Sequence, residues 1–210
     1  MAEAAPEASA PVALGENETA AQRARRDRIL QATLALASRG GYEAVQMREV
    51  AERSGVALGT LYRYFPSKVH LLVSAMASEL ETMRRRMQRR AVPGATRRER
   101  VSYVLERSTR NLQRDPNLTD AMVRAMMAAD ATMAAEVNRV RGLMNDLIIQ
   151  ALRGDGQSTP DDEGYASILQ DVWFARQIAW LGGRIGTAEV WRDIEGAIDL
   201  VLREEPVPSG

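Results

Sequence analysis

The chain has 210 residues, of which 45% are hydrophobic and 27% charged, and its formal net charge is +0. These values predict a soluble globular protein. The absence of cysteine and the single histidine, His70, exclude disulfides, thiolate metal sites and histidine-based catalysis. No apolar run reaches membrane-spanning length, and the first residues lack a signal-peptide pattern. We therefore expect a cytoplasmic protein that has no catalytic residues, binds no metal or cofactor and does not enter a membrane.

Charge is distributed unevenly along the chain. Residues 20–70 contain nine lysine or arginine residues and four acidic residues, so this part carries a net charge of +5 and the remainder carries −5. A basic N-terminal unit on an acidic body is typical of a protein that docks on DNA through one end.

The chain begins with residues 1–18, which are rich in Ala, Pro and Glu and have no apolar periodicity, so we expect this tail to be disordered. Thr19 is a suitable N-cap for a helix that reaches about Arg39, and Gly40–Gly41 can act as its C-cap. The first turns of this helix are rich in arginine. Like charges at a helix N-terminus are unfavourable unless an anion attends them.

Two of these arginine residues, Arg25 and Arg26, are candidates for contact with the backbone or minor groove of DNA, as in proteins that carry a basic arm. The alternative is a solvated helix start with no partner.

Residues 47–68, MREVAERSGVALGTLYRYFPSK, have the pattern of a helix-turn-helix. Apolar residues repeat at helical spacing from Met47, Gly55 interrupts the pattern, and a short second helix can start at Leu58. The residues expected to pack on the scaffold are Val56, Leu61 and Phe65. The residues expected to lie on the outward, DNA-facing side are Ala57, Gly59, Thr60, Tyr62, Arg63 and Tyr64. Hydroxyl and guanidinium groups on stiff stems suit contacts with phosphates and base edges.

A third helix should follow, because Pro66 ends the short helix and Ser67 is a suitable N-cap. Lys68 then lies in the first turn, where a cation opposes the helix dipole. A DNA phosphate beside Lys68 and the free backbone N–H groups would offset this repulsion, so we predict that Lys68 contacts DNA.

The run GTLYRYFPSK, with AERSGVALG before it, resembles the DNA-binding domain of the TetR family of bacterial repressors. The resemblance implies an all-α fold with a three-helix helix-turn-helix domain at 19–66, an effector-binding and dimerisation domain at 67–203 and a tail at 204–210. It also implies a homodimer that binds double-stranded DNA at a palindromic operator. The flanks GGYEAVQM and SKVHLLVSAM are similar to those of family members that control cholesterol catabolism in actinobacteria. This similarity implies an apolar effector derived from a sterol, as a coenzyme A thioester.

One position departs from the family pattern. Gln46 stands where a Thr or Ser cap is common, which weakens the start of the helix that follows. Arg48, one turn inside that helix, is the candidate to replace the lost phosphate contact. The alternative is a surface ion pair between Arg48 and Glu52.

A long helix from Ser67 to about Arg90 should connect the two domains, since its apolar stripe extends along its whole length. Its end and the segment after it are crowded with arginine: Arg84, Arg85, Arg86, Arg89, Arg90, Arg97, Arg98 and Arg100. Such a run is usually a solvated face or a complement to the helix dipole. The alternative is that part of it holds an anionic end of the effector.

Helical periodicity and breaker residues predict the rest of the body. The helices expected there span about 97–114, 117–129, 132–153, 161–182 and 187–203. The candidate effector-binding residues are Met83, Met122, Met126, Leu147, Trp173 and Gln177. Methionine at helical spacing suits either a core or an adaptable pocket, and sparse polar groups among bulky apolar ones are typical of small-molecule sites.

The last helix carries more apolar surface than one side can bury, including Trp191, Ala197 and Leu202 beside its main stripe. The family resemblance implies that the last two long helices of each chain pair in a four-helix dimer interface.

These observations favour a ligand-responsive repressor. A helical enzyme is a poor alternative, because a catalytic site needs convergent titratable groups and the body offers no clustered acid pair. A TetR-type activator, or a sensor of a different hydrophobic ligand, remains open, because the sequence alone does not distinguish an activator from a repressor.

Overall fold

The structure is a computed structural model of the chain and describes residues 19–89, 91–154, 156–157 and 159–203. The predicted tails at 1–18 and 204–210 lie outside the described residues. Every regular element of the described part is helical, which confirms the all-α prediction. The elements are α1 (Ala20–Ala44), α2 (Met47–Ser54), α3 (Leu58–Tyr64), α4 (Lys68–Gln88), α5 (Arg97–Arg114), α6 (Pro116–Ala128), the 3-10 turn η1 (Ala131–Met133), α7 (Ala134–Arg153), α8 (Asp162–Leu181) and α9 (Thr187–Val201).

Helix α1 begins as the sequence predicts. The Thr19 hydroxyl accepts a hydrogen bond from the Gln22 N–H at 3.2 Å, and the Gln22 side chain accepts one from the Thr19 N–H at 2.8 Å, which together form a capping box. The predicted end is confirmed as a kink, because Gly40 and Gly41 have non-helical dihedral angles. Gly41 needs to be glycine, since its φ of +67 is a left-handed conformation. A short helical turn follows the kink and is counted within α1.

Helices α2 and α3 form the predicted helix-turn-helix. Gly55 ends α2 in a left-handed conformation, with φ 67, and its N–H bonds back to the last turn. Leu61 and Phe65 are buried, at 0% and 3% exposure, which confirms the predicted packing face of α3. Gln46 makes no side-chain cap to α2, as its chemistry predicts.

The body helices lie within a few residues of their predicted bounds. Helix α5 starts after Thr96, which forms a second capping box with Glu99. Only the predicted helix at 132–153 differs. There the Asp130 carboxylate accepts a hydrogen bond of 2.9 Å from the Thr132 N–H and starts the 3-10 turn η1, and α7 begins after it.

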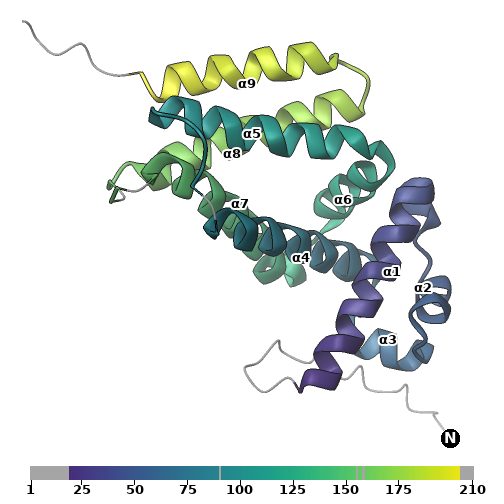
Figure 1. The fold of residues 1–210 in the computed structure, drawn as a ribbon. Coiled ribbons are helices and arrows are strands. Elements are labelled where there is room, and N and C mark those ends of the chain that lie inside the picture. The colour runs from purple at the N-terminus through teal and green to yellow at the C-terminus, as the bar shows by residue number, and fades with distance from the viewer. Residues whose placement is uncertain (1–18, 90, 155, 158, 204–210) are drawn as a thin grey trace, which may run out of the picture.

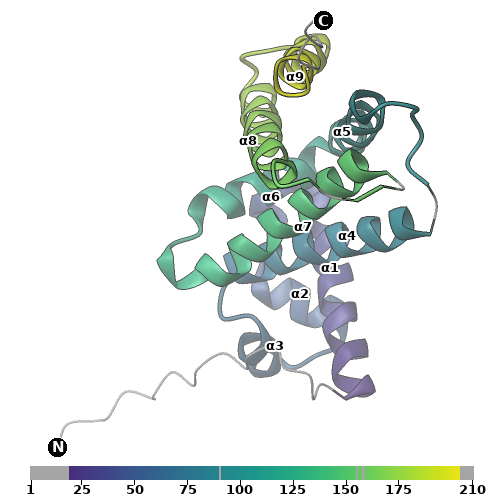
Figure 2. The ribbon, with the colours of Figure 1, turned by 90° about the vertical axis from the view of Figure 1, so that its left-hand side faces the viewer.

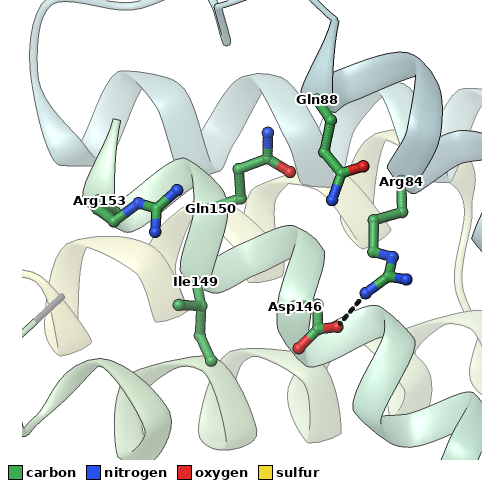
Figure 3. A pocket seen from close by; sticks show the side chains of 6 residues that line it. All are labelled: Arg84, Gln88, Asp146, Ile149, Gln150 and Arg153. Atoms are coloured by element: carbon green, nitrogen blue, oxygen red, sulfur yellow. Dashed lines mark hydrogen bonds and ion pairs between the residues drawn. The ribbon is translucent and has the colours of Figure 1, made fainter. Parts of the chain in front are cut away.

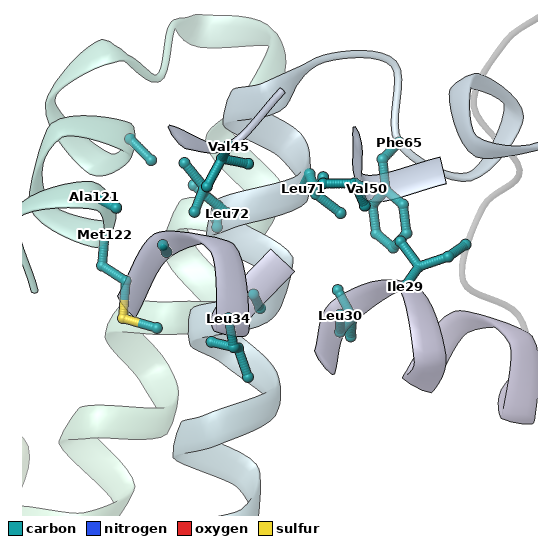
Figure 4. Packing of buried hydrophobic residues seen from close by; sticks show 14 of the residues in the cluster. Ile29, Leu30, Leu34, Val45, Val50, Phe65, Leu71, Leu72, Ala121 and Met122 are labelled. Atoms are coloured by element: carbon teal, nitrogen blue, oxygen red, sulfur yellow. The ribbon is translucent and has the colours of Figure 1, made fainter. Parts of the chain in front are cut away.

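The helices pack around two hydrophobic clusters. The first contains residues of α1, α2, α3 and α4, but also Ala121 and Met122 of α6. Figure 4 shows these two side chains near Leu34 of α1 and Leu72 of α4. The second cluster contains residues of α5, α7, α8 and α9. The predicted domain boundary after residue 66 therefore separates helices that share one core.

The arrangement places α4 between the two ends of the molecule. Helices α1, α2 and α3 lie together at one end and α9 at the other, with α4 and α7 between them (Figures 1 and 2). Helix α4 packs on α1 and α6 and also along α7. Helix α4 therefore connects α7 to the α1–α3 unit through direct packing contacts. Among the described residues, no helix combines the length and apolar character needed to cross a bilayer.

Candidate DNA-binding surface and effector pocket

The outward side of α3 is the candidate DNA-binding surface. Tyr62 is 46% exposed, Ala57, Gly59 and Arg63 are exposed, and Thr60 is half-buried. The four exposed positions agree with the predicted outward face, and Thr60 is only partly open to solvent. The opposite side is anchored by buried Leu61, so the exposed hydroxyl and guanidinium groups project from a fixed backbone.

Tyr64 differs from the expectation. It was predicted to face outward, but it is half-buried and its side chain packs against the first hydrophobic cluster, with its ring centroid 6.3 Å from that of Phe65. The reason is helical geometry, because Tyr64 lies three residues after Leu61 and so shares much of the buried face. Tyr62 is therefore the tyrosine that α3 presents to solvent.

The basic start of α1 lies at the same end of the molecule as α3 (Figures 1 and 2). Arg25 and Arg26 are both half-buried, and the Nε atom of Arg26 is buried without a hydrogen-bond partner among the described residues. Arg28 has a partner within the protein. Its Nε donates a hydrogen bond of 3.4 Å to the Ser54 carbonyl, which joins α1 to the end of α2.

Lys68 has partners within the protein. Its Nζ donates a hydrogen bond of 3.1 Å to the Tyr42 carbonyl, lies 3.9 Å from the centroid of the Tyr42 ring and is 3.8 Å from a carboxylate oxygen of Glu43. A DNA phosphate is thus not required to explain a cation in the first turn of α4. The predicted N-cap is confirmed, because the Ser67 hydroxyl accepts a hydrogen bond from the His70 N–H. A contact between Lys68 and DNA remains a prediction.

Arg48 is exposed on the first turn of α2. Within the part of the chain that the structure describes, it forms no ion pair with Glu52, which was the alternative reading of this residue. Arg48 is the second residue of α2, whose N-terminus has no side-chain cap.

A small apolar pocket lies in the body. It encloses about 50 Å³ and is bounded by α4, α6, α7 and α8. Its lining residues are Met76, Leu80, Met126, Val140, Arg141, Met144, Gln170, Trp173 and Phe174. The wall that α4 contributes, Met76 and Leu80, lies on the helix that also carries the α1–α3 unit.

Of the six predicted effector-binding residues, Met126 and Trp173 line this pocket. The other four do not. Met122 is buried in the first cluster, at 6% exposure, while Leu147 at 0% exposure and half-buried Met83 belong to the second. Gln177 is fully buried two turns beyond Gln170 on α8. Met127, which follows Met126 on α6, is 66% exposed because successive helical residues point in different directions.

Gln170 and Phe174 were missed from the sequence. A signal for Gln170 existed, since it lies three residues before Trp173 on the same helical face. The Trp173 side chain is held in place by a hydrogen bond of 3.0 Å that its indole Nε1 donates to the Thr109 hydroxyl on α5. Trp173 thereby joins the pocket wall to the second cluster.

A second, open hollow of about 320 Å³ lies between the C-terminal halves of α4 and α7. Figure 3 shows its polar lining, with Arg84 and Gln88 on α4 opposite Asp146, Gln150 and Arg153 on α7. Arg84 Nη1 donates a hydrogen bond of 3.0 Å to Asp146. Ile149 completes the lining.

Most of the arginine residues after α4 hold the body together. Arg97 pairs with buried Asp162, and Arg98 pairs with Asp199 at the surface. The hydrogen bond between Arg98 and Asp199 raises the pKa of Arg98 and lowers that of Asp199. Arg100 donates to the carbonyls of Ala151 and Leu152, at 2.8 and 3.2 Å, and so caps the end of α7. Arg84 differs from these arginine residues because it lines the open hollow between α4 and α7. Arg153, a second cation, lines the same hollow from α7.

Comparison with known proteins identifies the class to which this fold and surface belong. The family described as "Bacterial regulatory proteins, tetR family" matches residues 29–75, and "Tetracyclin repressor-like, C-terminal domain" matches residues 94–201. The chain belongs to the TetR family and is a transcriptional repressor with a helix-turn-helix, not an enzyme.

Three relatives show which members of the family the chain is similar to. The chain is 51% identical over 195 residues to the HTH-type transcriptional repressor KstR of Rhodococcus jostii, which covers 92% of this chain and 91% of the relative. A crystal structure of a TetR transcriptional regulator from Rhodococcus sp. RHA1 is 35% identical, with a TM-score of 0.79 over 87% of this chain and 98% of that one. Thermus thermophilus FadR, in complex with lauroyl-CoA, has the same fold at 23% identity, with a TM-score of 0.69 over 88% of this chain and 100% of that one.

Proposed function

We propose that the protein acts in the cytoplasm as a homodimeric repressor of sterol catabolism genes, bound to a palindromic operator and released by a large apolar effector. The effector class we favour is the coenzyme A thioester of a sterol-derived catabolite. The observation that carries the proposal is the position of α4, which forms one wall of the apolar pocket and also packs on the DNA-binding unit.

The exposed side of α3 supports the DNA-binding role. Thr60 and Tyr62 offer hydroxyl groups and Arg63 a guanidinium group from one short helix. In helix-turn-helix proteins the second helix enters the major groove, where such groups meet base edges and phosphates. Arg25 and Arg26 at the start of α1 extend this basic surface toward the flanking backbone, and Arg48 and Lys68 extend it on the other helices.

Apolar side chains on the last two helices support a dimer. Ile168 on α8 is 53% exposed and Leu200 on α9 is 69% exposed, so each of the last two helices presents a large aliphatic side chain to solvent. Burial of these side chains against a second copy would create a two-fold axis. Two copies of α3 then meet half-sites roughly 34 to 36 Å apart, which is one turn of DNA.

The two hollows support an effector with one apolar and one anionic part. Both lie between α4 and α7, the apolar one bounded by Met76 and Leu80 and the basic one by Arg84. An acyl-coenzyme A has an apolar acyl group and a phosphorylated nucleotide. The similarity to KstR and to FadR, whose structure is a complex with lauroyl-CoA, favours this class of ligand.

The size of the apolar pocket supports a release mechanism. It encloses about 50 Å³, whereas sites for drug-sized ligands enclose roughly 300 to 1,000 Å³. A sterol can enter only if α4 separates from α7 and α8. Because Leu71 and Leu72 of α4 are fully buried in the core shared with α1, this movement tilts the DNA-binding unit. The spacing of the two α3 helices in the dimer then changes, and the operator is released.

The test is a titration of the protein on its operator, obtained first by selection from random duplex DNA. Fluorescence anisotropy would report release by a steroid acyl-coenzyme A, with palmitoyl-coenzyme A and free coenzyme A as comparisons. We expect release by the steroid thioester at the lowest concentration. Undiminished DNA binding at saturating steroid thioester would reject this effector class, and release by palmitoyl-coenzyme A alone would indicate a fatty-acid sensor.

A further inference from the structure

The apolar pocket contains one polar side chain that the protein itself leaves unpaired. Gln170 on α8 is 6% exposed, and its Oε1 atom is buried with no hydrogen-bond partner among the described residues. Around it the pocket wall is formed by Met144, Trp173 and Phe174 and by side chains of α4 and α6. A buried amide oxygen without a partner destabilises the folded protein, so its presence in an apolar wall needs an explanation.

Several buried hydroxyl groups elsewhere in the fold have hydrogen-bond partners. Thr33 and Ser108 donate to carbonyls one turn earlier in their own helices, and Thr119 donates to Leu112. Thr109 accepts the indole N–H of Trp173. In the described part of the chain the Ser102 hydroxyl and amide atoms of Gln113, Asn145 and Gln177 also lack partners. Of these unpaired groups, Gln170 is the one that lines the apolar pocket.

A second glutamine on α8, Gln177, allows the effect of an unpaired buried amide to be distinguished from the effect of bordering the pocket. Gln177 is fully buried, and both its Oε1 and Nε2 atoms lack partners in the described part of the chain, yet it does not line the pocket. Gln177 therefore provides a buried, unpaired amide outside the pocket, whereas Gln170 borders the pocket.

We propose that Gln170 is a specificity-determining residue that hydrogen-bonds an oxygen atom on the part of the effector seated in the apolar pocket. This inference rests on the proposed function, since it assumes a ligand in that pocket. The protein then favours a ring system with a hydroxyl or keto group over the corresponding hydrocarbon, because only the oxygenated ligand gives the buried amide a partner.

The chemistry of the pocket limits the group that Gln170 can recognise. The Oε1 atom of Gln170 can accept a hydrogen bond from a hydroxyl group. A keto group can accept only from Nε2, which reaches the same place when the amide turns over. A carboxylate is disfavoured, because the nearest cation on the lining, Arg141, is already hydrogen-bonded to Asp171 at 2.8 Å. Moving an anion into apolar surroundings without its own cation is costly. The group is therefore a neutral oxygen substituent.

The experiment compares three coenzyme A thioesters that differ at one ring position. Cholanoyl-coenzyme A has no ring oxygen, lithocholyl-coenzyme A has one hydroxyl group, and dehydrolithocholyl-coenzyme A has one keto group. Isothermal titration of the full-length dimer would give a Kd for each. We expect at least one oxygenated thioester to bind roughly tenfold more tightly than cholanoyl-coenzyme A, the ratio that one hydrogen bond to an otherwise unpaired buried group supplies.

Substitutions at position 170 test whether Gln170 causes the difference in Kd between the oxygenated thioesters and cholanoyl-coenzyme A. Gln170→Leu and the less branched Gln170→Met keep the volume and remove the amide, so we expect the ratio to fall to about one in both. Gln177→Leu is the matched control, because it removes an equally buried amide outside the pocket and should leave the ratio unchanged. Thermal unfolding should show that Tm is kept or raised in all three variants, since each removes an unsatisfied polar group.

The outcomes distinguish the two proposals. If the three thioesters bind the native protein with equal Kd, Gln170 does not recognise an oxygen atom on the ring system. The same conclusion holds if Gln170→Leu and Gln170→Met keep the native ratio of Kd values. Neither result contradicts the proposed repressor function. If no steroid thioester binds the native protein, both the proposed effector class and this inference are overturned.

Discussion

The side-chain amide of Asn117 donates a hydrogen bond of 3.2 Å to the backbone carbonyl of Ser38. This contact joins the start of α6 to α1 just before the kink at Gly40 and Gly41. The Asn117 carbonyl in turn lies close to Gly41, where a Cβ atom would approach it to 3.7 Å. The body therefore holds the DNA-binding unit at the end of α1 as well as through α4.

We expect Asn117→Ala to weaken the communication between effector and DNA. The apolar packing of α6 on α1 remains, so the fold should persist. The coupling free energy, which is calculated from the ratio of operator affinities without and with effector, should fall by about 0.5 to 1 kcal/mol. Anisotropy titrations with and without effector measure this ratio. Asn138→Ala, at an exposed position on α7, is the control, and an equal change in both variants would remove the Asn117 contact from the coupling path.

The exposed side of α3 predicts three different responses to substitution. Arg63→Ala should lower the slope of log affinity against log salt by about one, because one cation that displaces counterions is lost. Tyr62→Ala should weaken binding to all duplexes with little change in slope, since the hydroxyl is uncharged. Thr60→Ala should instead change the sequence selected from random DNA. If all three variants retain native affinity, slope and preference, α3 is not the reading helix.

Filling the apolar pocket should mimic the effector. Met126→Trp adds volume beside Met76 and Leu80 and can be accommodated if α4 moves away, so operator affinity without effector should fall several-fold, at a stability cost of about 1–3 kcal/mol. Met127→Trp makes the same change one residue later, where the side chain is 66% exposed, and should leave affinity unchanged. DNA binding and urea unfolding of the two variants would be compared. Native affinity in a folded Met126→Trp variant would contradict the lever role of α4.

Two neighbouring arginine residues should differ strongly in their contribution to stability. Arg100→Ala removes charge-assisted hydrogen bonds to two carbonyls at the end of α7, so the free energy of unfolding should fall by about 2 kcal/mol or more. Arg98→Ala breaks one surface ion pair with Asp199 and should cost less than about 1 kcal/mol. Urea unfolding measures both changes. Equal losses would mean that the carbonyl cap on α7 contributes no more than a surface pair.

Asp162 should make stability depend on pH in acid. Burial by itself raises the pKa of this carboxyl, but hydrogen bonds from Thr159 and the charge of Arg97 outweigh it and hold the pKa below its ordinary value of 3.8. Because the folded pKa is the lower one, the stabilisation is complete above the unfolded pKa and is lost as the pH falls through the folded pKa. We expect Asp162→Asn to lose about 1–3 kcal/mol near neutral pH and to flatten the acid limb of the stability curve.

The control for this prediction is Asp199→Asn. The hydrogen bond from Arg98 also lowers the pKa of Asp199, but this pair is exposed and screened by salt. Its effect should disappear at high salt, whereas that of Asp162→Asn should persist. Parallel urea titrations across the acid range at two salt concentrations would separate them, and an unchanged acid limb in Asp162→Asn would disprove the assignment.

Local chemistry made much of the fold predictable. The bounds of α5 follow from the Thr96 cap and the Asp115–Pro116 break, and the kink in α1 follows from its glycine pair. These signals act within a few residues of each other, so the sequence displays them directly.

Features that depend on distant contacts were not predictable. Met122 and Met126 are one turn apart on α6, but only the convergence of four helices decides that Met126 borders a pocket and Met122 does not. Likewise, Lys68 appeared to need a phosphate because its partner, the Tyr42 carbonyl, lies 26 residues earlier in the chain. Periodicity assigns a residue to a face, and tertiary packing decides what that face meets.

The near-closed state of the apolar pocket, which encloses about 50 Å³, also determines how quickly the repressor responds. A ligand that must wait for helices to part enters at a rate limited by how often the gap opens, and this rate reaches a plateau as ligand concentration rises. In the proposed mechanism, the packing around Trp173 and Met144 therefore sets the upper limit of the association rate. Rapid-mixing traces that level off with rising ligand concentration would report the opening rate of these helices.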